Sequence, residues 1–331
     1  MKVLVTGGAG YIGSFTIKAL KEAGYEPVIF DSLETGHAEA VEGTKIYQGN
    51  LRSDLDLLDE VFKKEHPEAV IHFAAYIEVG ESVLNPQKYF ANNVLGSMNL
   101  LKAMLENNVL KIVFSSTAAV YGEPKNILVE EDDPKEPTNP YGESKLIIEK
   151  ILTYYAKAYK FSVVALRYFN AAGAALDGSM GQDYPKPTHL ITRACEAFLG
   201  KNNNFAIFGN DYATLDGTCI RDYIHVLDLA SAHLAALKSF DDMSGFRAYN
   251  VGASQGYSVL EVINFLKKVS GIDKEISIAP RREGDPSKLT AGIDKIRKEL
   301  SWEPKYSDLE TIIKSSWLWH KNHPNGFKDQ K

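Results

Sequence analysis

Short apolar runs alternate with stretches of helical periodicity along the first half of the chain. The runs with the length and composition of strands are residues 3–5, 28–30, 45–48, 69–73, 111–115 and 162–167. The stretches in which apolar residues recur at helical spacing are residues 12–20, 55–66, 91–107 and 141–159. Strands that alternate with helices form a parallel sheet with helices on both faces. The pattern therefore predicts an α/β fold built on a doubly wound parallel sheet.

The pattern changes after Asn170, where loops rich in Gly, Asp and Pro separate shorter elements. We expect a second, smaller C-terminal α/β domain to begin there and to bind the substrate. The predicted domains are residues 1–170, rejoined by parts of residues 225–250, and residues 171–331. The sequence contains no long linker between them, so a ligand is expected in the crevice at the carboxyl ends of the strands.

Three glycines at a step of three residues follow the first predicted strand. Gly7, Gly10 and Gly13 stand directly before the first helical stretch. A cradle for a dinucleotide needs this spacing, because the chain must turn sharply, approach a diphosphate closely and pack the helix against the strand. The N-terminus of that helix then faces the phosphates. The segment therefore predicts the dinucleotide site of a Rossmann fold.

An acid ends the second predicted strand. Asp31 follows Gly13 at the distance where a Rossmann unit places the carboxylate that hydrogen-bonds the adenosine ribose. Neither Arg nor Lys occurs from Ser32 to His37, so no cation is available there to bind a 2′-phosphate. These residues predict NAD, and not NADP, as the cofactor.

Composition excludes several classes of function. The 331-residue chain has a net charge of −6, so it offers no basic surface for nucleic acid. The sequence shows no apolar run near the ~18 residues of a membrane span, and no signal segment at its start. Cys195 and Cys219 have neither metal-site spacing nor the number of a disulfide framework. We expect a cytoplasmic protein without a metal site, a nucleic-acid partner or a membrane contact.

Tyr141 and Lys145 stand four residues apart at the start of a predicted helix, so their side chains share one face. An ammonium and the positive nicotinamide ring both favour the phenolate, which makes Tyr141 a candidate base near neutral pH. The predicted strand before this helix runs into Ser115, Ser116 and Thr117, and Thr117 could relay or orient a proton. Taken alone, an exposed Tyr–Lys pair and a capping hydroxyl explain these residues equally well.

The segments GGAGYIG, SSTAAVYG and YGESK together resemble the extended short-chain dehydrogenase/reductase superfamily. Within it, further segments are similar to the UDP-glucose 4-epimerase (UDP-galactose 4-epimerase) family. These are HFAAYIEVGES (72–82), NNVLG (92–96), LRYFNAAGA (166–174), IFGNDYATLDGTCIRDYIHV (207–226) and RREGD (281–285). The resemblance implies galactose metabolism: reversible inversion at sugar carbon 4 of UDP-glucose and UDP-galactose through a 4-keto sugar, with tightly bound NAD.

The resemblance also implies roles for individual residues. Those implied in catalysis are Tyr141, Lys145 and Thr117. Those implied to bind NAD are Gly7, Gly10, Tyr11, Ile12, Gly13, Asp31, Ser32, Asn50, Leu51, Phe73, Ala74, Ala75, Asn92, Ser115, Tyr141, Lys145 and Tyr168. Those implied to bind the UDP-sugar are Thr117, Tyr141, Asn170, His189, Leu190, Ala206, Phe208, Arg221, Arg282, Asp285 and Leu289. The two arginines suit a diphosphate, because a guanidinium fork matches its oxygens.

Four positions depart from patterns common in the family. Asn50 replaces a frequent Asp near the adenine and can still accept a hydrogen bond. Ile77 stands where some members have a cofactor-contacting Lys, which removes one charge. His189 stands where some relatives have Asn, and it either binds substrate or is a packed residue. Leu289 stands where some members have a bulky Tyr, so an N-acetylated UDP-sugar could also fit.

The sequence leaves alternatives open. A sugar-nucleotide 4,6-dehydratase shares the cradle and the Tyr–Lys pair, but it usually has an Asp-Glu pair where Ala118 and Ala119 stand here. A UDP-glucuronate epimerase or decarboxylase is another relative, and a non-catalytic NAD-sensing protein belongs to a different class. We also expect a homodimer, because the predicted helices at residues 91–107 and 141–159 carry more apolar positions than one stripe against the sheet requires, and the family pairs them.

Overall fold

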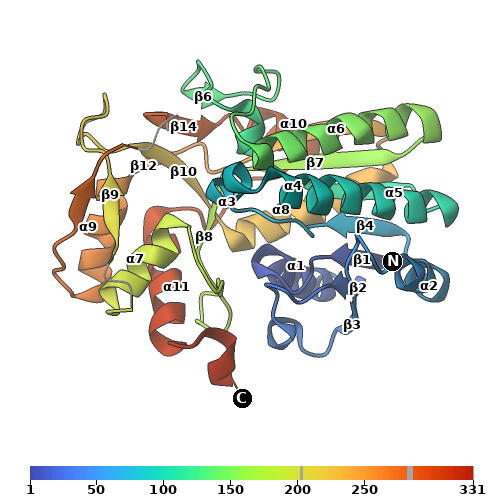
Figure 1. The fold of residues 1–331 in the computed structure, drawn as a ribbon, viewed down its shortest axis with the longest axis horizontal. Helices are drawn as coiled ribbons and strands as arrows, with labels where there is room; N and C mark the ends of the chain where they lie inside the picture. Colours follow the sequence, from blue (N-terminus) through green and yellow to red (C-terminus); the bar gives the residue numbers. More distant parts are fainter. Residues whose placement is uncertain (202–203, 282–285, 331) are drawn as a thin grey trace.

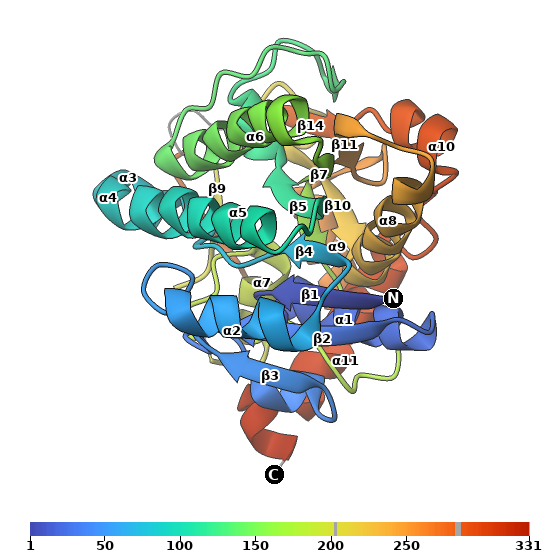
Figure 2. The same cartoon turned by 90° about the vertical axis from the view of Figure 1, so that its right-hand side faces the viewer.

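A seven-stranded parallel sheet forms the centre of the molecule, which we describe from a computed structural model covering residues 1–201, 204–281 and 286–330. The strands lie in the order β11-β7-β5-β4-β1-β2-β3 (Figure 2). Their bounds are β1 (Lys2–Thr6), β2 (Glu26–Asp31), β3 (Lys45–Gln48), β4 (Ala69–His72), β5 (Lys111–Thr117), β7 (Ser162–Tyr168) and β11 (Gly245–Val251). Every neighbouring pair in this sheet is parallel, which confirms the predicted sheet.

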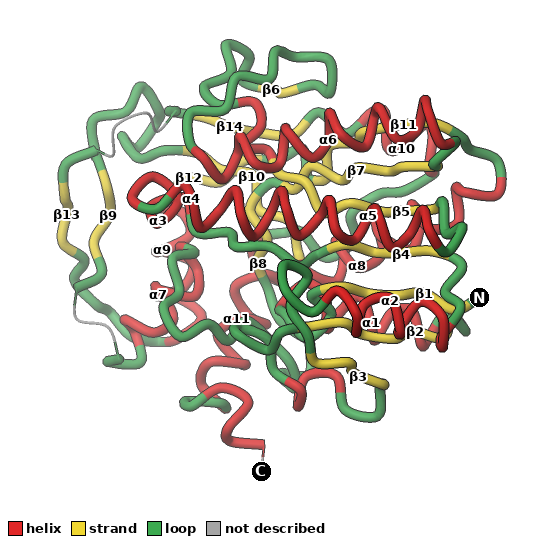
Figure 3. The backbone as a smooth tube through the Cα atoms, turned by 45° about the vertical axis from the view of Figure 1, so that its right-hand side comes forward, coloured by secondary structure: helices red, strands yellow, loops and turns green. Residues whose placement is uncertain are grey.

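Helices cover both faces of this sheet (Figure 3). On one face, the helices packed against the strands are α2 (Leu55–Glu65), α5 (Gly96–Glu106) and α6 (Pro140–Tyr159). On the other face, they are α1 (Tyr11–Glu22), α8 (Val226–Lys238) and α10 (Asp294–Leu300). Apolar side chains alternate between the two faces along each strand, as in Val3, Leu4 and Val5 of β1, so both layers have their own core.

The second part of the molecule carries smaller sheets and a separate core (Figure 1). One sheet joins β12 (Gly256–Ser258), β10 (Ile220–His225), β14 (Lys288–Ala291) and β6 (Leu128–Val129), with β8 (Asn170–Ala172) beside β10. A two-stranded sheet joins β9 (Ala206–Phe208) to β13 (Ser277–Ala279). The helices here are α7 (Leu190–Phe198), α9 (Val259–Ser270) and α11 (Leu309–Asn322). The predicted domain boundaries stay a prediction, although β11 does lie in the large sheet.

Two helices depart from the predicted bounds in ways that matter for the site. The predicted helix at residues 91–107 begins as a wider π-helical turn at residues 90–95 and becomes α5 only at Gly96, directly after the short helices α3 (Val79–Leu84) and α4 (Pro86–Tyr89). Helix α6 begins at Pro140, because Asn139 accepts a hydrogen bond from the backbone N–H of Gly142 at 2.9 Å and proline suits the first helical position. That cap places Tyr141 in the first turn of α6.

Candidate active site

The glycine loop between β1 and α1 forms a cradle in which side chains do not fit. Gly7 has a φ of +72°, and a Cβ there would lie 2.5 Å from the backbone nitrogen of Ala74. A Cβ on Gly13 would collide with the carbonyl oxygen of Gly7. Gly10 caps α1 in an extended conformation without a side-chain cap, so the helix N-terminus stays open. The predicted cradle fits the diphosphate of a dinucleotide.

Asp31 lies at the carboxyl end of β2 beside this cradle and is buried. Its two carboxylate oxygens accept hydrogen bonds at 2.9 Å from the backbone N–H groups of Ala9 and Leu33. Each oxygen has a second lone pair, so the carboxylate can still accept a ribose hydroxyl. Burial raises the pKa of the Asp31 carboxyl, and the two backbone bonds oppose that rise. The geometry suits the ribose of NAD.

Tyr141, Thr117 and Lys145 meet at the carboxyl end of β5. Thr117 is the last residue of that strand, and its hydroxyl hydrogen-bonds the phenol of Tyr141. One turn further along α6, the Lys145 Nζ donates a hydrogen bond of 2.8 Å to the backbone carbonyl of Ser115. The Thr117 hydroxyl also accepts a 3.1 Å bond from the Ala119 N–H. The structure thus brings all three predicted catalytic residues together.

The protein groups alone favour a neutral phenol, and the predicted depression of its pKa depends also on the positive nicotinamide ring. Burial raises the pKa of Tyr141 to about 12, and only the hydrogen bond with Thr117 opposes it. Lys145 does not act as a permanent cation, because burial lowers the pKa of its ammonium to about 7. The predicted effect of Lys145 on the pKa of Tyr141 assumed a fully charged ammonium. The four-residue spacing in the sequence does not reveal that Lys145 is buried at the edge of the sheet.

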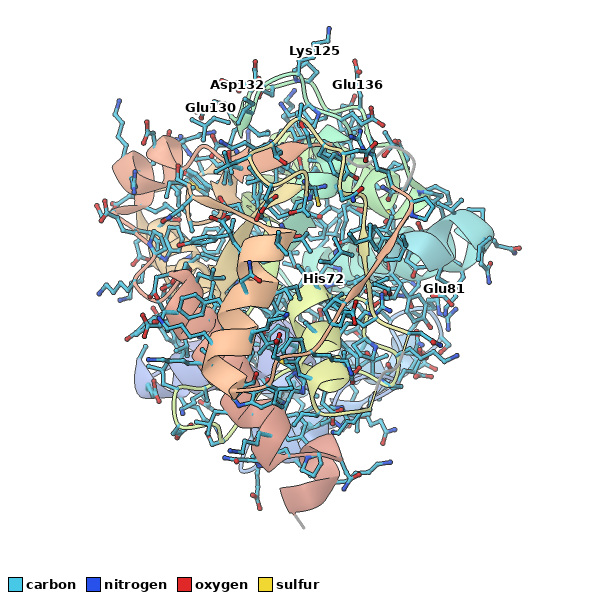
Figure 4. The ribbon with its side chains drawn as sticks, turned by 90° about the vertical axis from the view of Figure 1, so that its left-hand side faces the viewer. His72, Glu81, Lys125, Glu130, Asp132 and Glu136 are labelled. Carbon is cyan, nitrogen blue, oxygen red and sulfur yellow. The ribbon has the colours of Figure 1, made fainter. Side chains whose placement is uncertain are left out.

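Two buried hydrogen-bond networks fix the strand ends below the site. His72 joins Thr6 at 2.7 Å to Ser97 at 2.8 Å, and burial lowers its pKa to about 3, so it stays neutral. Figure 4 shows His72 in the interior. Tyr168, at the end of β7, hydrogen-bonds His233 of α8 and also Ser115. These contacts hold the ends of β1, β4, β5 and β7 in register.

A buried ion pair ties α6 to the strands that carry the catalytic hydroxyls. Arg167 of β7 and Ser116 of β5 are register partners, and both bind Glu149 of α6. The Ser116 hydroxyl donates at 2.6 Å, and the Arg167 guanidinium donates at 3.0 and 2.7 Å. Since Glu149 lies one turn beyond Lys145, this pair sets the distance from α6 to the end of β5.

Several of the residues implied to bind UDP-sugar lie on the smaller sheets. Asn170 is the first residue of β8, and its side-chain amide donates a hydrogen bond of 2.7 Å to the backbone carbonyl oxygen of Asp222 on β10. Arg221 of β10 and Leu289 of β14 are register partners in a parallel pair, so their side chains lie on the same face. Ala206 and Phe208 form the two ends of β9. Arg282 and Asp285 lie outside the described residues.

His189 lies directly before α7, whose first residue is Leu190. Its ring stacks on Tyr184 at 6.1 Å, and its Nδ1 lies 3.3 Å from the amide nitrogen of Gln182. Burial lowers the pKa of His189 to about 4, so the imidazole is neutral near pH 7. A substrate contact by His189 stays a prediction.

Most of the remaining predicted cofactor residues line the same edge of the sheet. The side chain of Tyr11 is an exception. Its phenol donates a hydrogen bond of 2.6 Å to the backbone carbonyl of Gly173, so only the backbone of Tyr11 can face the cradle. The side-chain oxygen of Asn50 already accepts hydrogen bonds from the backbone N–H and the guanidinium of Arg52. It is therefore less able to accept a hydrogen bond from adenine than we predicted. The others, placed in the loops and first turns that follow the strands, are Ile12, Ser32, Leu51, Phe73 and Ala75, whereas Asn92 lies in the π-helical turn before α5.

Glu78 was not predicted from the sequence. It lies just before α3, hydrogen-bonds Thr188 from the other side of the crevice, and its charge raises the pKa of Tyr141. Burial raises the pKa of Glu78 itself. Its local sequence does not distinguish Glu78 from an exposed acid. Its two neighbours in space, Tyr141 and Thr188, lie about 60 and 110 positions further along the chain.

The cradle and the Tyr–Lys–Thr group define a class of protein. A doubly wound sheet with both features is a Rossmann-type dinucleotide-binding protein with the site of a short-chain dehydrogenase/reductase. Residues 3–252 match the NAD dependent epimerase/dehydratase family, and the chain belongs to that family. The family membership confirms the resemblance and the cofactor predicted from the sequence.

Known proteins resemble the chain over its full length. It is 50% identical to a UDP-glucose 4-epimerase of Halalkalibacterium halodurans, over 100% of this chain and 98% of that protein. A solved UDP-glucose 4-epimerase from Brucella ovis in complex with NAD has a TM-score of 0.92 and 44% identity, over 96% of this chain and 97% of that one. The solved structure of the UDP-Glc/GlcNAc 4-epimerase of Campylobacter jejuni has a TM-score of 0.85 and 46% identity, over 97% of this chain and 99% of that chain.

Within residues 1–201, 204–281 and 286–330, we find no helix that is long and apolar enough to cross a membrane. Over the same residues we find no group of three His, Cys, Asp or Glu side chains placed to bind a metal ion.

Proposed function

We propose that this protein inverts carbon 4 of UDP-glucose and UDP-galactose, in both directions, with one NAD that stays bound. The observation that carries the proposal is the meeting of Tyr141, Thr117 and Lys145 beside the glycine cradle. Relatives that are named UDP-glucose 4-epimerases support it, since they match the chain over its full length.

The chain's own residues supply proton transfer and positioning. Tyr141 removes the proton of the sugar hydroxyl at carbon 4 and, after the sugar has turned, returns a proton to the same oxygen, and the Thr117 hydroxyl orients that proton beside the phenol. When bound, NAD accepts a hydride from carbon 4 and gives it back, and its positive ring favours the Tyr141 phenolate. Lys145 holds the nicotinamide ribose from its fixed place beside Ser115.

Inversion requires that the nucleotide stays anchored while the sugar turns. Arg221 is the described cation that we assign to the UDP diphosphate, because a guanidinium fork matches the phosphate oxygens. Leu289 lies on the same face as Arg221 and presents only an aliphatic side chain to the sugar. A sugar with few directional contacts can rotate about its bond to the diphosphate, which exposes either face to the same cofactor.

The test is incubation of the purified protein with UDP-galactose and no added NAD, followed by chromatography of the nucleotide sugars. We expect UDP-glucose to form, and the Tyr141→Phe variant to form far less. A 4-keto-6-deoxy sugar as the product would identify a dehydratase instead. Absence of any turnover in protein that contains NAD would favour a non-catalytic NAD-sensing protein.

We extend the proposal to N-acetylated UDP-hexoses. Leu289 lacks the ring of a tyrosine, and this leaves more room beside Arg221 for an acetamido group. A relative named a UDP-Glc/GlcNAc 4-epimerase supports the extension.

We also infer a cytoplasmic homodimer. Helices α3, α5 and α6 expose apolar side chains on the face away from the sheet, among them Val83, Leu84, Met98 and Tyr154. Such a surface suits a second copy of the chain. Cys195 and Cys219 are both buried thiols, in keeping with a reducing compartment. Sedimentation equilibrium tests the dimer, and a mass near 36.7 kDa at micromolar concentration would contradict it.

A further inference from the structure

Three loops at the carboxyl edge of the large sheet are joined through one carboxylate. Glu34 lies in the loop after β2, Asn50 in the loop after β3 and Tyr76 in the loop after β4. The Tyr76 phenol donates to Glu34 Oε2 at 2.6 Å, and the Asn50 amide donates to Glu34 Oε1 at 3.3 Å. We call Glu34 and Tyr76, with the hydrogen bond between them, the clasp.

The order of the strands determines what the clasp spans. β1 lies between β4 and β2 in the sheet, as Figure 2 shows. A bond from the loop after β4 to the loop after β2 must therefore pass over the carboxyl end of β1, where the glycine cradle begins. Glu34 is also close enough to Asp31 to raise the pKa of that carboxyl. The clasp thus crosses the groove between the cradle and the ribose-binding acid.

The Tyr76 side of the clasp is rigid. Asn93, which is buried, accepts the Tyr76 N–H at 2.9 Å and donates to the Tyr76 carbonyl at 3.0 Å. The same amide group donates 3.0 Å to Ser144, the neighbour of Lys145 on α6. The Lys88 ammonium lies 4.3 Å from the centre of the Tyr76 ring. Tyr76 is therefore held in place, so the clasp opens by movement of Glu34.

Glu34 is the side that can move. Its side chain is exposed, whereas the loop around it is held by hydrogen bonds of the Leu33 N–H to Asp31 and of the His37 N–H to the carbonyl of Ala9, so the bond to Tyr76 can break while the loop stays attached. Burial and the Glu34 charge raise the pKa of Tyr76 to about 12, so the phenol keeps its proton and donates throughout the neutral range. A phenol that donates to a carboxylate forms one of the stronger kinds of hydrogen bond.

We propose that the clasp closes over the adenosine half of bound NAD and slows its release. This inference rests on the proposed function, which needs one NAD to stay bound through many turnovers. NAD can leave only after the Tyr76–Glu34 bond opens.

The experiment measures exchange of bound NAD against added isotope-labelled NAD, by mass spectrometry of the cofactor released on denaturation. Tyr76→Phe removes only the phenol hydroxyl, and Glu34→Ala removes the acceptor at an exposed position. We expect each variant to exchange about tenfold faster than the native protein, the size of one charge-assisted hydrogen bond in a site open to water. The double variant should exchange no faster than Glu34→Ala alone, because that change already removes the bond from Tyr76.

Tyr89→Phe is the matched control. Its phenol donates 2.9 Å to Glu81, and its ring lies 5.8 Å from that of Tyr76, but its bond does not cross β1. Exchange in this variant should equal the native rate. Equal exchange in Tyr76→Phe and the native protein would overturn the clasp while leaving the epimerase proposal intact. A native protein purified without NAD would overturn both.

Discussion

The Lys145 ammonium lies 2.8 Å from the backbone carbonyl of Ser115, and this contact joins α6 to the end of β5. Because Tyr141 precedes Lys145 by four residues on the same helix face, the contact also places the phenol beside Thr117, two residues beyond Ser115. A second contact between α6 and β5, the hydrogen bond from the Ser116 hydroxyl to Glu149, lies one turn further along α6. The catalytic phenol therefore lies on a helix that is fixed to the strand at two points.

Tyr141→Phe should lower turnover by ~10²–10⁴-fold, the usual contribution of a positioned acid–base group. The ring and its packing remain, so the affinity for UDP, measured by calorimetry, should stay the same. Tyr154→Phe is the control on the same helix, since its side chain is 71% exposed. Near-native turnover in Tyr141→Phe would show that another group is the base.

Glu78→Gln should shift the pH dependence of kcat/KM to lower pH. The Glu78 carboxylate raises the pKa of Tyr141, so its removal stabilises the phenolate and lets the base form at lower pH, by up to about one unit. Rates of UDP-galactose conversion measured over about four pH units, from about pH 6 to about pH 10, give the profile.

The control for this shift is Glu81→Gln. Glu81 lies on α3, pairs with Lys88 at 2.7 Å, and lies at the periphery of the molecule in Figure 4. Its profile should coincide with that of the native protein. An unchanged profile in Glu78→Gln would mean that Glu78 does not act on the catalytic phenol.

Gly7→Ala should yield protein with little or no bound NAD. The new Cβ would lie 2.5 Å from the Ala74 nitrogen, so the cradle would have to widen. Gly24→Ala is a matched control: its φ of +80° imposes the same backbone strain, but no atom lies within 4 Å of the added Cβ. NAD released on denaturation is the measurement. Full NAD content in Gly7→Ala, or recovery of NADP from the native protein, would contradict the assigned cradle.

Local patterns were sufficient for the sheet and for the residues that we assign to the reaction. The strand predicted at residues 45–48 coincides with β3, and the glycine spacing, Tyr141, Lys145 and Thr117 all stand in short segments whose meaning is local. Glu78, Glu34 and Tyr76 could not be found in this way, because their roles come from loops that approach each other only in the folded chain. The pKa values likewise depend on burial, which spacing does not reveal.

Leu289→Tyr should narrow the range of sugars. Leu289 and Arg221 share one face of the β10–β14 pair, so a larger side chain at position 289 would project beside the guanidinium that we assign to the diphosphate. A filled pocket tolerates only small changes of volume, and the tyrosine ring would occupy the space of an acetamido group at sugar carbon 2. We expect the native protein to convert both UDP-galactose and UDP-N-acetylgalactosamine, and the variant to convert only UDP-galactose. Leu289→Met, which keeps nearly the same volume, should retain both activities. Native protein that leaves the acetylated sugar unchanged, or a tyrosine variant that still converts it, would show that Leu289 does not set this specificity.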